Sequence, residues 1–152
     1  MKPLGMPFLC AVAGTAAAYL LLLALNELAF THSEYVRGIN WIYLPAGARL
    51  LCTLLFGAAG ALGILIASWL ATIYYYFPDD FIRAAAGSAI SAGSPYLAYL
   101  LARRFFSLRD SLSNLTPKRL LICAVACAAV NTLLHQLWFL FRGARTAGGR
   151  LV

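Results

Sequence analysis

The chain has 152 residues, of which 62% are hydrophobic and 11% are charged. Soluble domains carry about 25% charged residues, and five acids with twelve bases are too few to cover a globule of this length. The composition therefore excludes an ordinary soluble domain, and it predicts an all-α integral membrane protein with about five transmembrane helices.

The net charge of +7 has to be read together with the positions of the bases. Most of them follow the ends of apolar blocks, where membrane proteins place cations that face lipid headgroups. These bases are Arg103, Arg104, Arg109, Lys118, Arg119, Arg142, Arg145 and Arg150. We therefore expect the lipid bilayer, and not a nucleic acid, to be the partner of this charge.

The first predicted span covers residues 8–30. Its apolar run is longer than the core of about 7–15 residues in a cleaved signal peptide, so we expect an uncleaved helix. Asn26 and Glu27 lie close to its far end. In the segment 31–40 that follows, Thr31 precedes Glu34 by three residues, which is a capping-box pattern and predicts a short interfacial helix.

Residues 41–77 form one apolar block. A single helix of that length would be nearly twice as long as the hydrocarbon core is thick, so the block must fold back. Glycines permit the backbone angles of such a corner, and they occur here at Gly57, Gly60 and Gly63. The sequence thus predicts a short second span over 44–57 and a third over 59–77.

The fourth predicted span covers residues 81–102 and is rich in Ala, Gly and Ser, which allow helices to approach closely in lipid. Asp79 or Asp80 can cap its first turn. Pro95 is expected to kink it.

The segment 104–115 alternates apolar and polar residues at helical spacing, which predicts an amphipathic helix on the membrane surface. Thr116 and Pro117 then provide the cap and first residue of a fifth span over 118–141. We expect one transmembrane domain over 1–142 and a mobile basic tail over 143–152. The interfacial residues are predicted to be Arg103, Arg104, Phe105, Leu108 and Leu112.

Five spans would bring distant ionisable residues to one leaflet. Glu27 ends the first span, Arg49 begins the second and His135 lies late in the fifth. Because charges within a bilayer usually face the bundle interior or a water-filled cavity, we predict a polar pocket of Glu27, Arg49, Asn131 and His135, with a Glu27–Arg49 ion pair. The alternative is that both charged side chains snorkel to the interface.

The fifth span carries Cys123, Cys127, Asn131 and His135 at four-residue intervals, which places them along one helix seam. This seam favours polar packing against a neighbouring helix, and the alternative is a ligand or proton site at His135. We predict no metal or cofactor site, because no CxxC or HxxxH spacing occurs. We also predict no disulfide framework and no catalytic activity, since the sequence lacks the GxSxG, HExxH and P-loop motifs.

Residues 41–104 resemble the membrane-associated sensor domain that precedes histidine kinases and diguanylate cyclases. The resemblance lies in an aromatic residue, a Pro-x-Gly break and an apolar helix that ends in LLFG, and it is carried by Trp41, Pro45, Gly47, Phe56 and Gly57. Members of that family usually have about eight or more spans and an output domain. The resemblance therefore implies a short, stand-alone version that acts through a partner.

These observations favour a small non-catalytic membrane protein, either a sensory or ligand-binding module or an accessory subunit. The expected partner is another membrane protein or a second copy, with a small-molecule ligand as a further expectation. One alternative is an oligomeric transporter or channel for small solutes. Another is a membrane enzyme that acts on a lipid-like substrate through Asp79, Asp80 and Arg83. The basic segment 103–119 favours a cytoplasmic N-terminus in a bacterial inner membrane, whereas the three arginines of the tail favour the reverse orientation.

Overall fold

The computed structural model describes residues 5–30, 34–36, 39–40, 43–76 and 78–148. The predicted helical architecture is confirmed, with one very short β-ladder in addition. The elements in chain order are α1 (Met6–Phe30), β1 (Glu34–Val36), β2 (Ile39–Asn40), α2 (Leu44–Phe56), α3 (Ala58–Ala71), the π-helical turn η2 (Thr72–Tyr76), α4 (Phe81–Phe106) and α5 (Pro117–Gly148).

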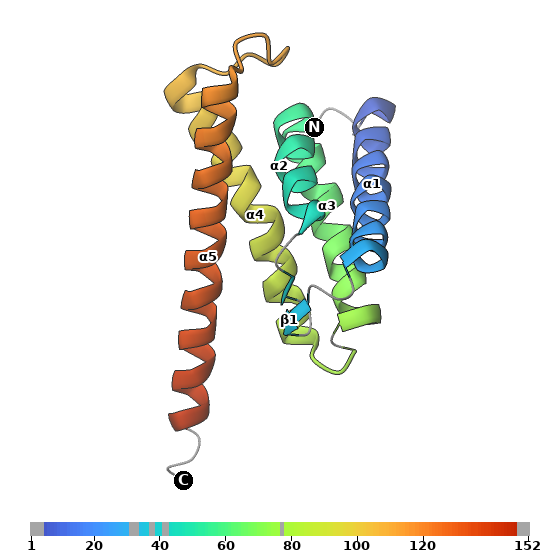
Figure 1. Ribbon diagram of the computed structural model, residues 1–152, viewed down its shortest axis with the longest axis vertical. Coiled ribbons are helices and arrows are strands. Elements are labelled where there is room, and N and C mark those ends of the chain that lie inside the picture. The colour runs from blue at the N-terminus through green and yellow to red at the C-terminus, as the bar shows by residue number, and fades with distance from the viewer. Residues whose placement is uncertain (1–4, 31–33, 37–38, 41–42, 77, 149–152) are drawn as a thin grey trace.

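The helices form a bundle in which α1, α3, α4 and α5 pack side by side in that order, while α2 packs on α1, α3 and α4. Consecutive helices run in alternating directions (Figure 1). One end of the bundle, which we call the α4–α5 end, holds the start of α1, the α2–α3 turn and the connection from α4 to α5. The opposite end, the η2 end, holds η2, the start of α4 and the end of α5 (Figure 1).

Three stretches of the described chain are long and apolar enough to cross a membrane, namely Met6–Phe30, Ala58–Tyr76 and Pro117–Gly143. The helix α2 is apolar but has only 13 residues. The helix α4 has 26 residues, but its many Ala, Gly and Ser residues make it less apolar than these three. The chain thus has the helices of a membrane protein.

The turn between α2 and α3 consists of Gly57 alone. Its φ of 56° and ψ of −125° lie where only glycine is comfortable. Its N–H donates to the Thr53 carbonyl oxygen at 2.8 Å and so closes α2. The corner was predicted to include Gly60 and Gly63 as well, but both lie within α3.

Gly60 and Gly63 serve helix packing instead. A Cβ at Gly60 would collide with the backbone carbonyl of Cys52 on α2. A Cβ at Gly63 would come within 2.6 Å of the Val12 carbonyl oxygen on α1. Because neither contact is with a flexible side chain, the absence of a Cβ at these two positions lets α3 lie directly against its neighbours.

The helix α4 begins as predicted with Asp80, whose carboxylate accepts a hydrogen bond from the Arg83 N–H at 2.9 Å. It continues through Pro95, which is buried inside the helix. The helix α5 begins at Pro117, and the Thr116 hydroxyl accepts from the Arg119 N–H at 3.3 Å. It extends to Gly148, beyond the predicted end at residue 141.

The predicted surface helix over 104–115 is wrong. The helix α4 continues to Phe106, and Ser107 then adopts a left-handed conformation with φ of 47°. From there to Thr116 the chain makes irregular turns, which we call the 107–116 loop. The physical reason is the burial of Leu108, whose side chain is only 5% exposed. Phe105 is 74% exposed and Leu112 is half-buried.

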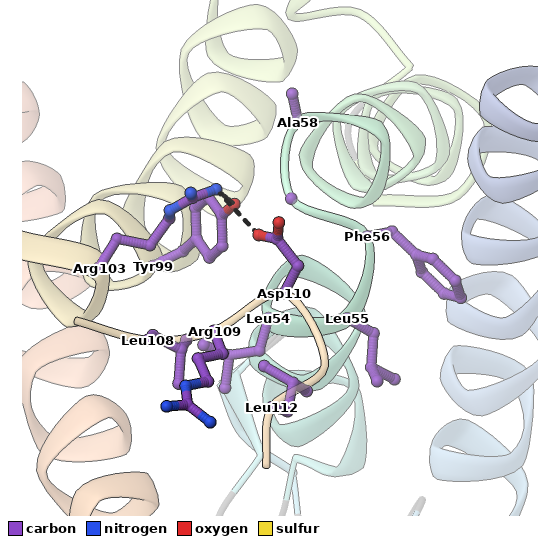
Figure 2. Close-up of a pocket in the computed structure, with 11 residues that line it drawn as sticks. Leu54, Leu55, Phe56, Ala58, Tyr99, Arg103, Leu108, Arg109, Asp110 and Leu112 are labelled. Atoms are coloured by element: carbon purple, nitrogen blue, oxygen red, sulfur yellow. Dashed lines mark hydrogen bonds and ion pairs between the residues drawn. The ribbon is translucent and has the colours of Figure 1, made fainter. Parts of the chain in front are cut away.

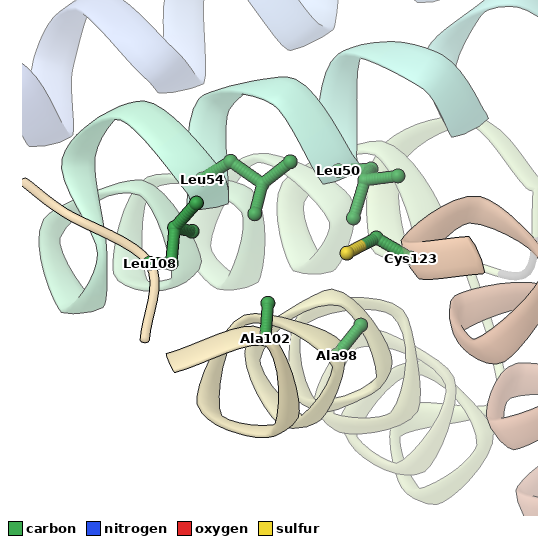
Figure 3. Packing of buried hydrophobic residues seen from close by; sticks show 6 residues of the cluster. All are labelled: Leu50, Leu54, Ala98, Ala102, Leu108 and Cys123. Atoms are coloured by element: carbon green, nitrogen blue, oxygen red, sulfur yellow. The ribbon is translucent and has the colours of Figure 1, made fainter. Parts of the chain in front are cut away.

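Leu108 belongs to an apolar cluster that joins the 107–116 loop to three helices (Figure 3). Burial of each large apolar side chain contributes about 1.5–3 kcal/mol, which outweighs the weak preference of a narrow amphipathic stripe for the interface. The members of the cluster are Leu50, Leu54, Ala98, Ala102, Leu108 and Cys123.

The helix predicted within 31–40 is also absent from the part that the structure describes. There β1 pairs antiparallel with β2, with Glu34 opposite Asn40 and Val36 opposite Ile39. The proposed cap residue Thr31 lies outside the described residues. Two short strands satisfy each other's backbone groups, which the capping-box pattern alone does not exclude.

Candidate functional site

The four residues of the predicted polar pocket do not come together in one place. Glu27 lies on α1, whereas Asn131 and His135 lie on α5, and these two helices form opposite flanks of the bundle (Figure 1). Arg49 on α2 lies between them. The residues of the predicted pocket therefore belong to two separate clusters of polar side chains, and Arg49 lies between these clusters.

The first group surrounds Glu27 near the η2 end. The carboxylate of Glu27 accepts a hydrogen bond from the Tyr76 hydroxyl at 2.9 Å and a longer one from the Tyr75 hydroxyl at 3.4 Å. The hydroxyls of Tyr19 and Tyr43 lie 3.1 Å apart and share a hydrogen bond. We call these four tyrosines, together with Glu27, the tyrosine cluster. They supply the polar partners that a carboxylate at this depth requires.

Arg49 makes contact with this cluster through a ring and not through a carboxylate. Its guanidinium carbon lies 5.3 Å from the centre of the Tyr43 ring, which is within cation–π range. Arg49 is also close enough to Cys127 on α5 to interact with it electrostatically. Among the described side chains, the predicted Glu27–Arg49 ion pair is not formed; the ion pairs found there are Arg103–Asp110 and Arg142–Asp80.

Asn26 was not predicted as a site residue, yet it organises this end of the bundle. Its side chain is fully buried, and its Oδ1 accepts a hydrogen bond from the Leu44 N–H at 2.9 Å. Leu44 begins α2, so Asn26 caps a helix that is distant in sequence and has Pro45 in its first turn. The signal in the sequence was an amide side chain inside an apolar span, since such groups need a partner.

The second group lies between α4 and α5. The Ser94 hydroxyl donates to the Asn131 side-chain oxygen at 3.4 Å. His135 Nδ1 lies 2.9 Å from the Asn131 backbone oxygen, one turn earlier on its own helix. On the same seam Cys123 is buried and Cys127 is half-buried. One of these contacts joins α4 to α5 and the other is local to α5, which is the pattern of a polar packing seam.

At the η2 end, Asp80 links α4 to α5. Its Oδ2 lies 2.8 Å from Arg142 Nη1, in addition to the helix cap that its other oxygen forms. The hydrogen bond from Arg142, together with that from the Arg83 N–H, lowers the pKa of the Asp80 carboxyl below its usual value. Asp79 is exposed. Capping and ion pairing thus account for Asp80, one of the three residues in the lipid-enzyme alternative.

The described chain has two recesses on its surface that are relevant to function. The first is an apolar groove of about 420 Å³ between α3 and α4, which we call the α3–α4 groove. Small residues form most of its floor, so the two helices present a shallow channel along the outside of the bundle. The groove is lined by Ala58, Ala61, Leu62, Leu65, Ala89, Ala92, Gly93 and Tyr96.

The second recess is a cavity of about 260 Å³ at the α4–α5 end, which we call the loop cavity (Figure 2). The α2–α3 turn, the end of α4 and the 107–116 loop enclose it. Leu54, Leu55, Phe56, Leu108 and Leu112 give it apolar walls. Tyr99, Arg103, Arg109 and Asp110 add polar groups.

The residues that carry the sensor-domain resemblance have different surroundings. Pro45 is buried at the start of α2, Gly47 is exposed within it, and Gly57 forms the turn. Phe56 is 48% exposed and borders the loop cavity. Trp41 lies outside the described residues. These positions give the segment a structural role, namely a short helix and its return.

Comparison with protein-family models, with curated proteins and with solved structures found no match to this chain. The resemblance to the membrane-associated sensor domain therefore stays a prediction. Within the described ranges, no three His, Cys, Asp or Glu side chains lie together in a way that could hold a metal ion. The function has to be argued from the two recesses and from the surfaces beside them.

Proposed function

We propose that this protein is a small, non-catalytic membrane module that binds a transmembrane helix of another membrane protein in the α3–α4 groove. In this proposal all five helices lie within the bilayer of a bacterial cytoplasmic membrane. The N-terminus is cytoplasmic, because the basic segment 103–119 lies at the same end of the bundle as the start of α1. A sensory role, as the family resemblance implies, would act through the bound helix.

The observation that carries the proposal is the shape and lining of the groove. Lipid is as apolar as a leucine side chain, so helices associate in membranes mainly where small residues permit close packing. Five of the eight residues that line the groove are Ala or Gly. The chain already uses such contacts internally, at Gly60 and Gly63 of the same helix α3. The groove offers an incoming helix a similar surface.

The polar residues support this reading over transport. A path for solutes would need Glu27, Arg49 and His135 along one route. Glu27 instead accepts hydrogen bonds from Tyr76 and Tyr75, and His135 contacts its own helix. These are the contacts of groups that stabilise a bundle.

Site-specific photocrosslinking in native membranes tests the proposal. Leu62 lines the groove and is 39% exposed, whereas Leu70 is 37% exposed on the same helix but does not line it. A photoreactive residue at position 62 should give one discrete adduct, and the same residue at position 70 should not. The substitution Gly93→Leu should abolish the adduct, because Gly93 has open space around it and a leucine there fills the groove.

Equal crosslinking at both positions, or an adduct that persists in Gly93→Leu, would contradict the proposal. An adduct between two copies of this chain would identify the partner helix as its own. The same three samples should show unchanged expression and thermal stability, since none of the changes removes a buried contact.

A further inference from the structure

The loop cavity combines apolar walls with polar side chains. Arg103, Tyr99 and Asp110 lie together on one side of it, and the guanidinium of Arg109 lies away from them (Figure 2). Leu55 and Phe56 border it and are 56% and 48% exposed, so its apolar wall continues onto the outside of the bundle. Its volume of about 260 Å³ is just below the range of about 300–1,000 Å³ for small-molecule sites, which suits a headgroup better than a whole ligand.

The donors in the cavity are held in place. Arg103 Nη1 donates to the Tyr99 hydroxyl at 2.9 Å and lies 3.3 Å from Asp110 Oδ1. A guanidinium has five N–H donors, so Arg103 keeps others for a ligand. Because the Tyr99 hydroxyl accepts from Arg103, its own O–H is available to donate. This part of the cavity thus presents several fixed donors to an acceptor.

Arg109 supplies a cation that the described part of the chain leaves unneutralised. Its backbone N–H donates to the Asn114 side-chain oxygen at 3.0 Å, but no hydrogen bond or ion pair to its guanidinium occurs among the described residues. The guanidinium lies apart from the Arg103–Asp110 pair (Figure 2). A ligand with a single negative group can therefore approach it without breaking an existing contact.

The 107–116 loop is built to hold Arg109 at this position. Asn114 Nδ2 donates to the Ser107 carbonyl oxygen at 3.0 Å, and Arg119 Nη1 donates to the Asn114 carbonyl oxygen at 2.8 Å. Leu112 has a φ of 53°, which is rare for a leucine. Because these contacts already order the loop, little conformational entropy is lost when a ligand binds.

The charge around the cavity selects an anion. Residues 103–119 contain five bases and one acid, an excess of four positive charges. They lie where α4 ends and α5 begins, which is the level of the headgroups if these helices span the bilayer. Cytoplasmic leaflets are rich in anionic lipids, which attract basic segments of this kind.

From these observations we propose that the loop cavity binds the phosphate of an anionic phospholipid headgroup. Arg109 provides the unpaired charge for the phosphate, and Arg103 and Tyr99, which lie apart from Arg109, provide oriented donors to other oxygens of the headgroup (Figure 2). Leu55 and Phe56 contact the start of the acyl chains. Asp110 opposes binding, since its carboxylate occupies Arg103 and repels the phosphate. This site is independent of the α3–α4 groove and of any helix bound there.

The test measures lipid affinity of the full chain in nanodiscs of phosphatidylcholine that contain rising fractions of phosphatidylglycerol. Arg109→Gln should weaken phosphatidylglycerol binding about tenfold, the effect of one charge-assisted hydrogen bond. Asp110→Asn should strengthen it. The matched control is Arg104→Gln, because Arg104 is an exposed neighbour of Arg103 that does not line the cavity; its affinity should stay within about twofold of the wild type.

The proposal is overturned if Arg104→Gln weakens binding as much as Arg109→Gln, since that would show only a diffuse basic surface. It is also overturned if phosphatidylcholine binds as well as phosphatidylglycerol. Inorganic phosphate and glycerol phosphate are added as competitors; displacement of the lipid at millimolar concentration would identify a free phosphate as the ligand and reject the lipid. If Arg109→Gln fails to fold, the opposite sign expected for Asp110→Asn decides, and unchanged or weaker binding in that variant rejects the site.

Discussion

Single polar side chains set the geometry of this bundle more than single apolar ones do. Asn26, whose side chain is fully buried, connects α1 to the first residue of α2 through one hydrogen bond of 2.9 Å. Its Nδ2, like the hydroxyl of the fully buried Thr15, has no hydrogen-bond partner within the described part of the protein. Substitutions of these two buried residues should therefore have opposite effects on stability, since the Asn26 Oδ1 accepts a hydrogen bond and the Thr15 hydroxyl forms none among the described residues.

The substitution Asn26→Ala should lower the free energy of unfolding by about 1–3 kcal/mol, because the partly buried Leu44 N–H would lose its acceptor. Thr15→Val keeps the shape of the side chain but removes an unsatisfied hydroxyl, so it should leave stability unchanged or raise it. Unfolding of both variants in mixed micelles, followed by circular dichroism, measures the difference. An equal loss in the two variants would mean that volume, and not the hydrogen bond, determines the cost.

At the scale of elements, the predictable features are those with local chemistry. Gly57 at the corner, Asp80 before α4 and Thr116 before α5 each act within four residues of their own position. The 107–116 loop could not be predicted, because Leu108 is buried by α2, which is about 50 residues earlier in the chain. The separation of Glu27 from His135 was equally hidden, since helix order in a bundle depends on packing and not on depth.

Two pairs of matched glycine substitutions test how close the helices lie. Gly60→Ala and Gly63→Ala should each destabilise the protein by about 1–3 kcal/mol, because the new Cβ meets the backbone of another helix. Gly87→Ala and Gly47→Ala meet no atom within 4 Å, and they should be neutral or stabilise by up to about 1 kcal/mol. Thermal midpoints in one detergent give the comparison, and a similar shift at all four positions would argue against close helix contacts.

At the scale of the whole molecule, the helices at the two flanks are attached differently. The helix α1 packs closely on α3 and α2, whereas α5 packs mainly on α4. Only 6% of the most apolar window of α5 is buried within the bundle. The ion pair between Arg142 and Asp80, which are 62 residues apart in the sequence, therefore attaches α5 to the start of α4 at the η2 end. The apolar cluster around Leu108 fastens its other end.

This ion pair makes the attachment of α5 sensitive to acid. Because the pKa of Asp80 is lowered in the folded protein, its stabilising effect is complete above the unfolded pKa of about 3.9 and is lost as the pH falls through the lower folded value. Asp80→Asn keeps a good helix cap but removes the charge. The thermal midpoint of the variant should thus be lower than that of the wild type at pH 6, and the two should converge below about pH 4. A gap that stays constant down to pH 3 would exclude this ion pair as its cause.

The single-residue turn at Gly57 also bears on how the protein is made. At about 1.5 Å per residue, α2 reaches only about 20 Å, which is less than the thickness of the hydrocarbon layer. Since nothing but Gly57 separates it from α3, the ribosome delivers the two helices to the insertion machinery almost as one piece. We expect them to enter the membrane together as a hairpin, so that the short helix never has to hold its own place among the lipids.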